Sequence, residues 1–160
     1  MPEFTLHPIA TVHNARKAIE DDFWGGLVSE LVLAPELPDG CLDGIEAFSH
    51  LEIIFAFHLT REDKTVLGAR RPRGDPRLPP VGIFAQRNKD RPNHLGLTTV
   101  RLLRREGRSL FVEGLDALDG TPVLDIKPVM LEYLPHGPVR QPGWTGELLK
   151  DYWKDASERP

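Results

Sequence analysis

The chain has 160 residues, of which 40% are hydrophobic and 28% charged, and this predicts one folded domain with a real hydrophobic core. No apolar run approaches the roughly 20 residues needed to span a membrane, and the first residues lack the layout of a signal peptide. Cys41, the single cysteine, has no internal partner for a disulfide, which favours a cytoplasmic location.

The net charge of −4 is unevenly distributed. Between Arg70 and Arg108, eleven Lys or Arg residues stand against three acidic residues, so this segment carries +8 and the rest of the chain carries −12. Two interpretations remain open. The segment either focuses an anionic partner such as a nucleic acid, or it is a solvated surface paired with the acidic remainder.

Fifteen prolines and fourteen glycines favour short strands with tight turns. Alternation of apolar residues predicts seven strands, which cover residues 4–13, 27–33, 50–58, 81–85, 95–103, 109–115 and 122–129. Residues 15–26 fit either a helical turn or a loop, and the Pro/Arg-rich residues 70–80 form a long loop. The Asp119-Gly120 pair predicts a hairpin turn before the last strand.

The tail differs from the rest of the chain. Leu148, Leu149, Tyr152 and Trp153 fall at helical spacing, which predicts a terminal helix over residues 145–156 docked on the strands. The elements together predict a mainly β fold with short helical additions and a C-terminal helix. We expect a single β-barrel-like domain over 1–160, with its core at about 5–135 and a helical tail at about 142–157.

The sequence lacks the motifs of several common kinds of active site. The sequence contains no GxGxxG or GxxxxGK[ST] loop, no GxSxG elbow and no zinc-ligand spacing, so we expect no metal. In FAQRNKDRPNHLGLT (84–98), Arg87 and Arg91 place two guanidinium groups in one loop, where they suit a carboxylate or phosphate. The alternative is a structured basic turn.

Two further segments carry candidate residues. In LDALDGTPVLDIKP (115–128), Asp116, Asp119 and Asp125 surround a turn, and Asp125 and Lys127 share one strand face. The alternative is an Asp-Gly hairpin with a surface ion pair. On the strand 50–58, the polar face with His58 either lines a cleft or is satisfied by backbone hydrogen bonds.

Taken together and in this order, EAFSHLEIIFAFHLT, VGIFAQRNKDRPNHLGLTTVRLL and LDALDGTPVLDIKP resemble the TsaA/YaeB-like family, the TrmO-type group of S-adenosylmethionine (SAM)-dependent tRNA methyltransferases. The match runs from about Pro8 to Pro128. The resemblance implies a β-barrel that binds SAM without a Rossmann fold and a homodimer with its site near the interface. It also implies methylation of N6-threonylcarbamoyladenosine, the tRNA base 3′ of the anticodon.

The resemblance also implies SAM contacts at His58, Leu59, Arg87, Leu97, Asp119, Gly120, Thr121 and Pro122. Three further positions complete the predicted cofactor site, namely Arg91, Asn93 and Trp24. Trp24 belongs to an Asp-Phe-Trp triplet that stands roughly where the tRNA enzymes have Pro-Arg-Gln. Asp125 and Lys127 are the predicted catalytic residues, since an acceptor nitrogen has to lose a proton.

The sequence departs from the family pattern at two places, and both concern the part of the protein expected to bind the methyl acceptor. Val129 replaces the tyrosine of the usual DIKPY, and the additional C-terminal domain of larger bacterial enzymes is replaced by the tail alone. We therefore expect SAM-dependent methylation of a tRNA base. The alternatives are a SAM-dependent methyltransferase with a non-tRNA acceptor and a non-catalytic barrel that binds SAM or RNA.

Overall fold

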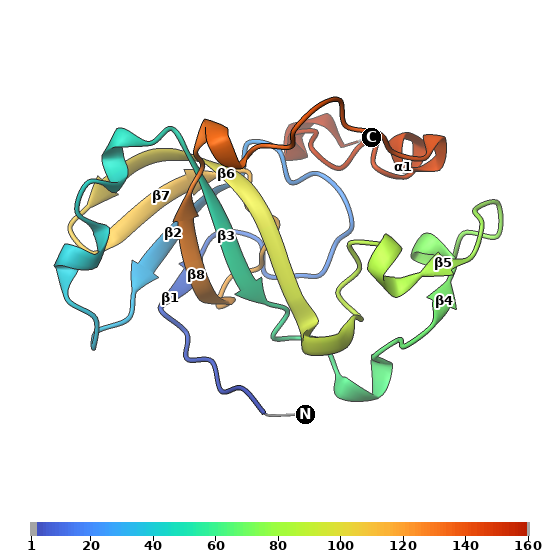
Figure 1. The fold of residues 1–160 in the computed structure, drawn as a ribbon, viewed down its shortest axis with the longest axis horizontal. Coiled ribbons are helices and arrows are strands. Elements are labelled where there is room, and N and C mark those ends of the chain that lie inside the picture. Colours follow the sequence, from blue (N-terminus) through green and yellow to red (C-terminus); the bar gives the residue numbers. More distant parts are fainter. Residues whose placement is uncertain (1–2, 160) are drawn as a thin grey trace.

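The computed structural model describes residues 3–159 and places eight strands and one α-helix along them (Figure 1). The elements are β1 Ala10–His13, β2 Val28–Leu33, β3 His50–Ala56, β4 Ala69–Arg70, β5 Val81–Gly82, β6 Leu95–Glu106, β7 Ser109–Glu113, β8 Pro122–Pro128 and α1 Gly143–Leu148. Short 3₁₀ turns occupy several connections, as the proline and glycine content favours.

Six strands close into an antiparallel barrel in the order β1-β2-β7-β6-β3-β8, because β8 pairs with both β3 and β1. β6 is the longest strand and pairs with β3 and β7. Closure removes the open sheet edges that would otherwise pair with other chains. The mainly β, barrel-like fold predicted from the sequence is confirmed.

Alternate residues of the strands fill the barrel interior. On β3, Leu51, Ile53 and Phe55 are at most 1% exposed, while the residues between them are only partly buried. Burying a side chain of this kind stabilises the fold by about 1.5–3 kcal/mol. The apolar face predicted for residues 50–58 is thus the core face of the barrel, except that Phe57 lies beyond the end of β3 and is half-buried.

Two segments outside the barrel lie at one end of it (Figure 1). The first, here called the insertion, is residues 57–94, which connect β3 to β6 and contain the two-stranded sheet of β4 and β5. The second, here called the C-terminal segment, is residues 140–159 and contains α1. Three backbone N–H groups attach it to the loop before β2, donating to carbonyl oxygens over 2.8–3.1 Å: Phe23 to Asp151, Trp24 to Tyr152 and Gly25 to Lys154.

Three strand boundaries differ from the prediction by three residues or more, and the others by at most two. The expected strand over 4–13 is wrong for residues 4–9, where Pro8 has no N–H to donate and Phe4 and Leu6 stay exposed. The expected strand over 81–85 pairs only at β5, after which Ile83–Ala85 tightens into a 3₁₀ turn. β6 instead runs beyond residue 103 to Glu106. The ambiguous residues 15–26 form a loop.

The predicted terminal helix over 145–156 is wrong beyond Leu148. Leu149 leaves the helical region with φ −106° and ψ 12°, and the backbone bonds to residues 23–25 then hold the chain in turns. The Asp119-Gly120 turn does form, but the predicted hairpin is wrong, because β7 and β8 are not neighbours in the barrel. Residues 114–121 instead cross the end of the barrel.

Gly96 on β6 faces the ring of Phe55, and a Cβ at this position would lie 2.3 Å from Cζ of that ring. Since Phe55 is 1% exposed, its ring cannot move away freely. We expect Gly96→Ala to lower the free energy of unfolding by about 1–3 kcal/mol in urea denaturation. Gly82→Ala, where a Cβ would meet nothing within 4 Å, is the control, and an equal loss there would contradict this explanation.

Candidate functional site

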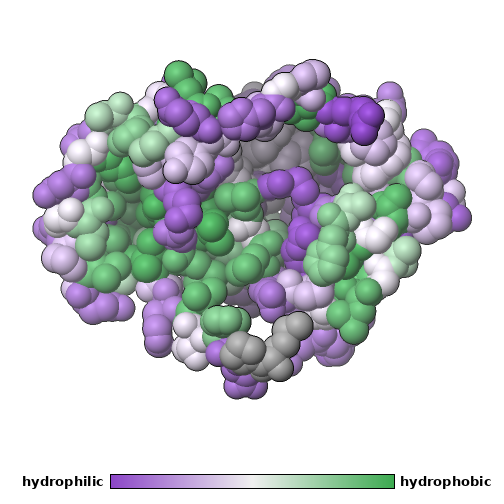
Figure 2. Space-filling model, viewed as in Figure 1, coloured by the Kyte–Doolittle hydropathy of each residue, from purple (hydrophilic) through white to green (hydrophobic). Residues whose placement is uncertain are grey.

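Two pockets lie where the insertion meets the barrel, and the C-terminal segment lines the larger of them. The larger has a volume of about 550 Å³, and Figure 2 shows the molecule hollowed beneath the C-terminal segment. Its lining comes from residues 19–24, from the end of β3, from the insertion and from the C-terminal segment. This volume falls within the roughly 300–1,000 Å³ typical of small-molecule sites.

Aromatic side chains line much of the larger pocket. Trp24 is 5% exposed, and the Arg16 guanidinium carbon lies 4.2 Å from the centre of its ring. Phe57 packs edge-on against Phe55, with ring centres 5.3 Å apart, and Trp144 of α1 also lines the pocket. Flat, apolar surfaces of this kind suit a planar ring such as adenine.

The smaller pocket has a volume of about 370 Å³ and is lined mainly by β3, by the start of β6 and by the insertion. It shares five wall residues with the larger pocket, namely Phe55, Phe57, Arg87, Thr98 and Asp116. Ligands in the two pockets would therefore contact some of the same side chains and lie next to one another. This arrangement suits a reaction between two bound molecules.

Arg87 and Arg91 supply positive charge to these pockets. Arg87 lines both and donates to the carbonyl oxygen of Leu97, while Arg91 lines the smaller one and donates to the carbonyl oxygen of Gln86 over 3.1 Å. Neither forms an ion pair with a carboxylate of residues 3–159. Because a guanidinium has five N–H donors, each retains donors for a ligand carboxylate or phosphate.

Most of the arginine-rich segment from Arg70 to Arg108 is neutralised within the molecule. Eight of its eleven cations pair with carboxylates: Arg70, Arg73, Arg77, Lys89, Arg101, Arg104, Arg105 and Arg108. For these eight, the structure supports the paired surface rather than an open basic track.

The remaining cations follow a clear pattern. Within residues 3–159, the lysines and arginines without a carboxylate partner all belong to the insertion or the C-terminal segment. They are Lys64, Arg71, Arg87, Arg91, Arg140 and Lys150. The unpaired cations thus lie on the two segments that line the larger pocket and not on the barrel strands. In the C-terminal segment, four acidic residues balance the four lysines and arginines.

Asp116 lies on the wall common to both pockets, and two hydroxyl groups hold its carboxylate. Thr98 donates to Oδ1 and Tyr152 donates to Oδ2. Burial raises the pKa of the Tyr152 hydroxyl far above its usual value, and the negative charge of Asp116 raises it further. Tyr152 therefore stays protonated and remains a donor to Asp116.

The structure brings seven of the predicted cofactor-binding residues to the pockets. Those that line the larger pocket are Trp24, His58, Leu59, Arg87 and Thr121, and those that line the smaller one are Arg87, Arg91 and Leu97. His58 Nδ1 lies 3.3 Å from the Thr121 hydroxyl, which links the end of β3 to the start of β8.

The other four predicted cofactor-binding residues lie outside the lining of both pockets: Asn93, Asp119, Gly120 and Pro122. Asn93 has a left-handed backbone (φ 65°), which asparagine tolerates, and it turns the chain into β6. The Asp119 carboxylate accepts a hydrogen bond from the backbone N–H of Asn14 over 3.1 Å. These positions stay predictions.

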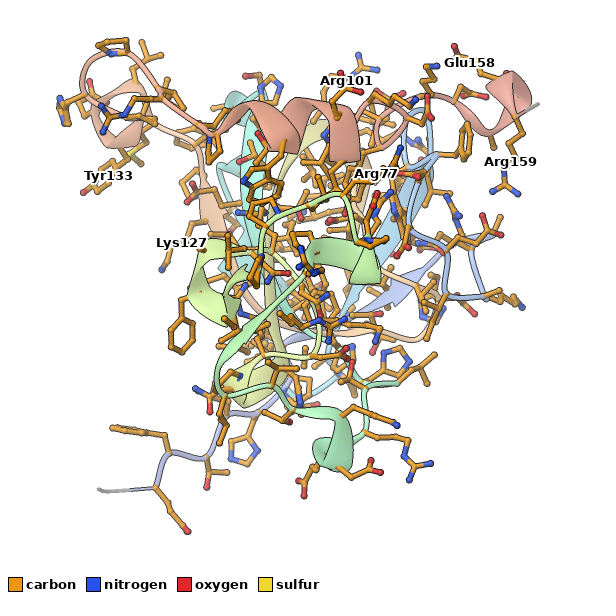
Figure 3. All side chains as sticks on the ribbon, turned by 90° about the vertical axis from the view of Figure 1, so that its right-hand side faces the viewer. Arg77, Arg101, Lys127, Tyr133, Glu158 and Arg159 are labelled. Atoms are coloured by element: carbon orange, nitrogen blue, oxygen red, sulfur yellow. The ribbon has the colours of Figure 1, made fainter. Side chains whose placement is uncertain are left out.

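Asp125 and Lys127, the predicted catalytic residues, form an ion pair on β8 with 2.7 Å between nitrogen and oxygen. Lys127 is exposed and Asp125 is partly buried, and the hydrogen bond from Lys127 to Asp125 raises the pKa of the lysine. Figure 3 shows Lys127 projecting outward from the barrel. The structure does not bring this pair to either pocket.

Sequence reasoning missed Tyr152 and Trp144 as pocket residues. It names Asp116 among the candidate acidic residues of the LDALDGTP motif but assigns it no role in the cofactor site or in catalysis. Tyr152 was assigned to an apolar helix face, with no sign of its carboxylate partner. In residues 3–159, no three His, Cys, Asp or Glu side chains are grouped as metal ligands, and no helix is long and apolar enough to cross a membrane.

Solved structures share this fold, and sequence relatives match part of the chain. The crystal structure of TrmO from Pseudomonas aeruginosa superposes on 90% of this chain and 62% of its own with a TM-score of 0.70 and 27% identity. A putative S-adenosylmethionine-dependent methyltransferase, RcsF of Pseudomonas aeruginosa, is 47% identical over 96 residues, which are 59% of this chain and 39% of that protein.

A human tRNA (adenine(37)-N6)-methyltransferase is 41% identical over 98 residues, which are 60% of this chain. The chain spans 21% of that protein and thus less than half the length of either curated relative. The model of the tRNA-methyltransferase O N-terminal domain family matches residues 19–133, which include β2 to β8 and most residues of both pockets. The resemblance found in the sequence is confirmed, and the chain belongs to the tRNA-methyltransferase O N-terminal domain family.

Proposed function

We propose that this protein is a SAM-dependent methyltransferase that acts on a tRNA base. The acceptor proposed is N6 of an adenosine 3′ of the anticodon, in its threonylcarbamoylated form. The observation that carries this proposal is the pair of pockets with a common wall. Methyl transfer requires donor and acceptor to be held in contact, and two pockets that share five lining residues would hold their ligands next to one another.

The chemistry of the larger pocket fits SAM, which supplies a methyl group on a sulfonium. Arg87 would hold the carboxylate of SAM through its remaining donors. Trp24 and Phe57 would cover the adenine. Arg91, on the neighbouring pocket, would face an anionic group of the acceptor, and a threonylcarbamoyl group carries a carboxylate.

The six unpaired cations support an RNA substrate. Because they belong to the two segments that form the larger pocket, phosphates contacted there would place a nucleotide near the pockets. The relatives support the same substrate, since one is named as a tRNA (adenine(37)-N6)-methyltransferase. A tRNA substrate also places the proposed activity in the cytoplasm.

We further propose a homodimer. The closed barrel offers no open edge for pairing, but large apolar side chains are exposed on the insertion side of the molecule. They are Leu59, Leu67, Phe84 and Leu97. A second copy that covered these side chains would also close the smaller pocket, which Leu97 lines.

The proposal is tested by incubating the protein with methyl-labelled SAM and total tRNA from cells that lack it. We expect label on the RNA, with transfer that declines steeply as salt rises and stops after RNase treatment. Label that reaches another acceptor after RNase treatment would favour a different methyltransferase. Binding of SAM or RNA with no S-adenosylhomocysteine formed would favour a non-catalytic barrel.

A further inference from the structure

We propose that Asp116 is the catalytic residue that accepts the proton of the acceptor nitrogen, and that Tyr152 of the C-terminal segment is its positioning residue. This inference rests on the proposed function. It assigns the proton transfer to a residue that lines both pockets, rather than to the Asp125 and Lys127 pair on the outside of β8.

The position of Asp116 is the first argument. It is the one carboxylate, among residues 3–159, that lines both pockets. The two other carboxylates of the larger pocket are neutralised, since Glu20 pairs with Arg16 and Arg159, and Asp21 lies 3.7 Å from Arg73. His58, the other candidate base, lines only the larger pocket.

The hydrogen bonds of Asp116 are the second argument. Its partners in the described part of the chain are two neutral hydroxyls, of Thr98 and Tyr152, and no cation pairs with it. A carboxylate has about four lone-pair sites, so two remain free for a donor on a ligand. Hydroxyl donors orient the group without neutralising its charge, which leaves Asp116 able to accept a proton.

The proton transfer balances the methyl transfer. As the nitrogen–carbon bond forms, the carbon–sulfur bond breaks and its electron pair stays on sulfur, which changes from a sulfonium to a neutral thioether. The nitrogen loses its proton to Asp116, and the carboxylate becomes a neutral acid. No oxidant, metal or further reactant is needed.

Tyr152 gives the C-terminal segment a role in this step. Its hydroxyl reaches Asp116 because the backbone of residues 151–154 is bonded to residues 23–25. The match to the family model covers residues 19–133, so Asp116 lies within the matched region and Tyr152 lies outside it. The geometry of the segment thereby sets the orientation of the base.

The test compares Asp116→Asn and Tyr152→Phe with wild type in methyl transfer to tRNA. We expect Asp116→Asn to lower kcat about 100- to 10,000-fold. Its dissociation constants for SAM and for tRNA, from calorimetry and filter binding, and its melting temperature should stay close to the wild-type values. Tyr152→Phe should lower kcat with KM unchanged. Asp43→Asn, at the far end of the barrel, makes the same charge change as a control.

Each outcome bears on the inference. A kcat for Asp116→Asn near that of wild type would overturn it and leave the proposed function intact. Equal losses of kcat and of SAM affinity would show that Asp116 only shapes the pocket, which also overturns it. Should Asp116→Asn fail to fold, an unchanged kcat in Tyr152→Phe would overturn it. If the wild-type protein transfers no methyl group to tRNA, the proposed function is contradicted, and the inference that rests on it is contradicted as well.

Discussion

Arg87→Ala is expected to abolish measurable SAM binding while the protein stays folded. Arg87 lines both pockets and has no carboxylate partner within residues 3–159, so its remaining donors are available to the carboxylate of SAM. Arg87 is exposed in the structure, and bound SAM would cover it. Removing one partner of a charge pair that is buried on binding typically costs about 2–5 kcal/mol, which is a loss of affinity of roughly 30- to several thousand-fold. Calorimetric titration with SAM measures it.

The fold should tolerate this change, because removing Arg87 leaves no buried carboxylate without its cation. Arg71→Ala is the matched control. Arg71 is another arginine without a carboxylate partner in the described chain and donates to the carbonyl oxygen of Leu78, but it lies outside both pockets. SAM affinity should be close to wild type in this control. If the Arg87→Ala protein bound SAM with undiminished affinity, Arg87 would not belong to the cofactor site.

Gly25→Val is expected to detach the C-terminal segment from the barrel. A Cβ at Gly25 would lie 2.0 Å from the carbonyl oxygen of Trp153, and no side-chain rotation relieves an overlap with backbone. The three backbone hydrogen bonds to residues 23–25 would be lost together, at about 0.5–1.5 kcal/mol each. Amide hydrogen exchange in the segment should therefore accelerate, while the barrel strands keep their protection.

Detachment would also open the larger pocket, since Trp144, Leu149 and Tyr152 form one of its walls. SAM should bind more weakly to the Gly25→Val protein. Gly146→Ala is the control within the same segment, because a Cβ there would meet nothing within 4 Å. Unchanged exchange in the Gly25→Val protein would mean that the segment is held by contacts other than those to residues 23–25.

The barrel was predictable from the sequence because strand periodicity is a local property. Residues 50–58 alternate apolar and polar side chains, and β3 buries Leu51, Ile53 and Phe55 as that pattern requires. The failures came where tertiary contacts override local preference. Helical spacing predicted a long terminal helix, but backbone bonds to residues 23–25 hold the chain in turns after Leu149.

The site was only partly predictable for the same reason. Arg87 and His58 were expected from motifs, and the structure brings both to the larger pocket. Asp116 and Tyr152 are 36 residues apart, and their contact exists only because residues 114–121 cross the barrel end beneath the C-terminal segment. Asp125 and Lys127 did share a strand face as predicted, but their ion pair lies outside both pockets.

The central proposal, methylation of a tRNA adenosine, is tested most directly by mass spectrometry of nucleosides. tRNA from cells lacking the protein would be treated with the protein and SAM, digested, and compared with an untreated sample. We predict that N6-threonylcarbamoyladenosine is converted to a nucleoside in which one methyl group replaces one hydrogen, and that its mass rises accordingly. An unchanged nucleoside profile, from a protein shown to bind SAM, would contradict the proposal and assign the pockets to a different acceptor.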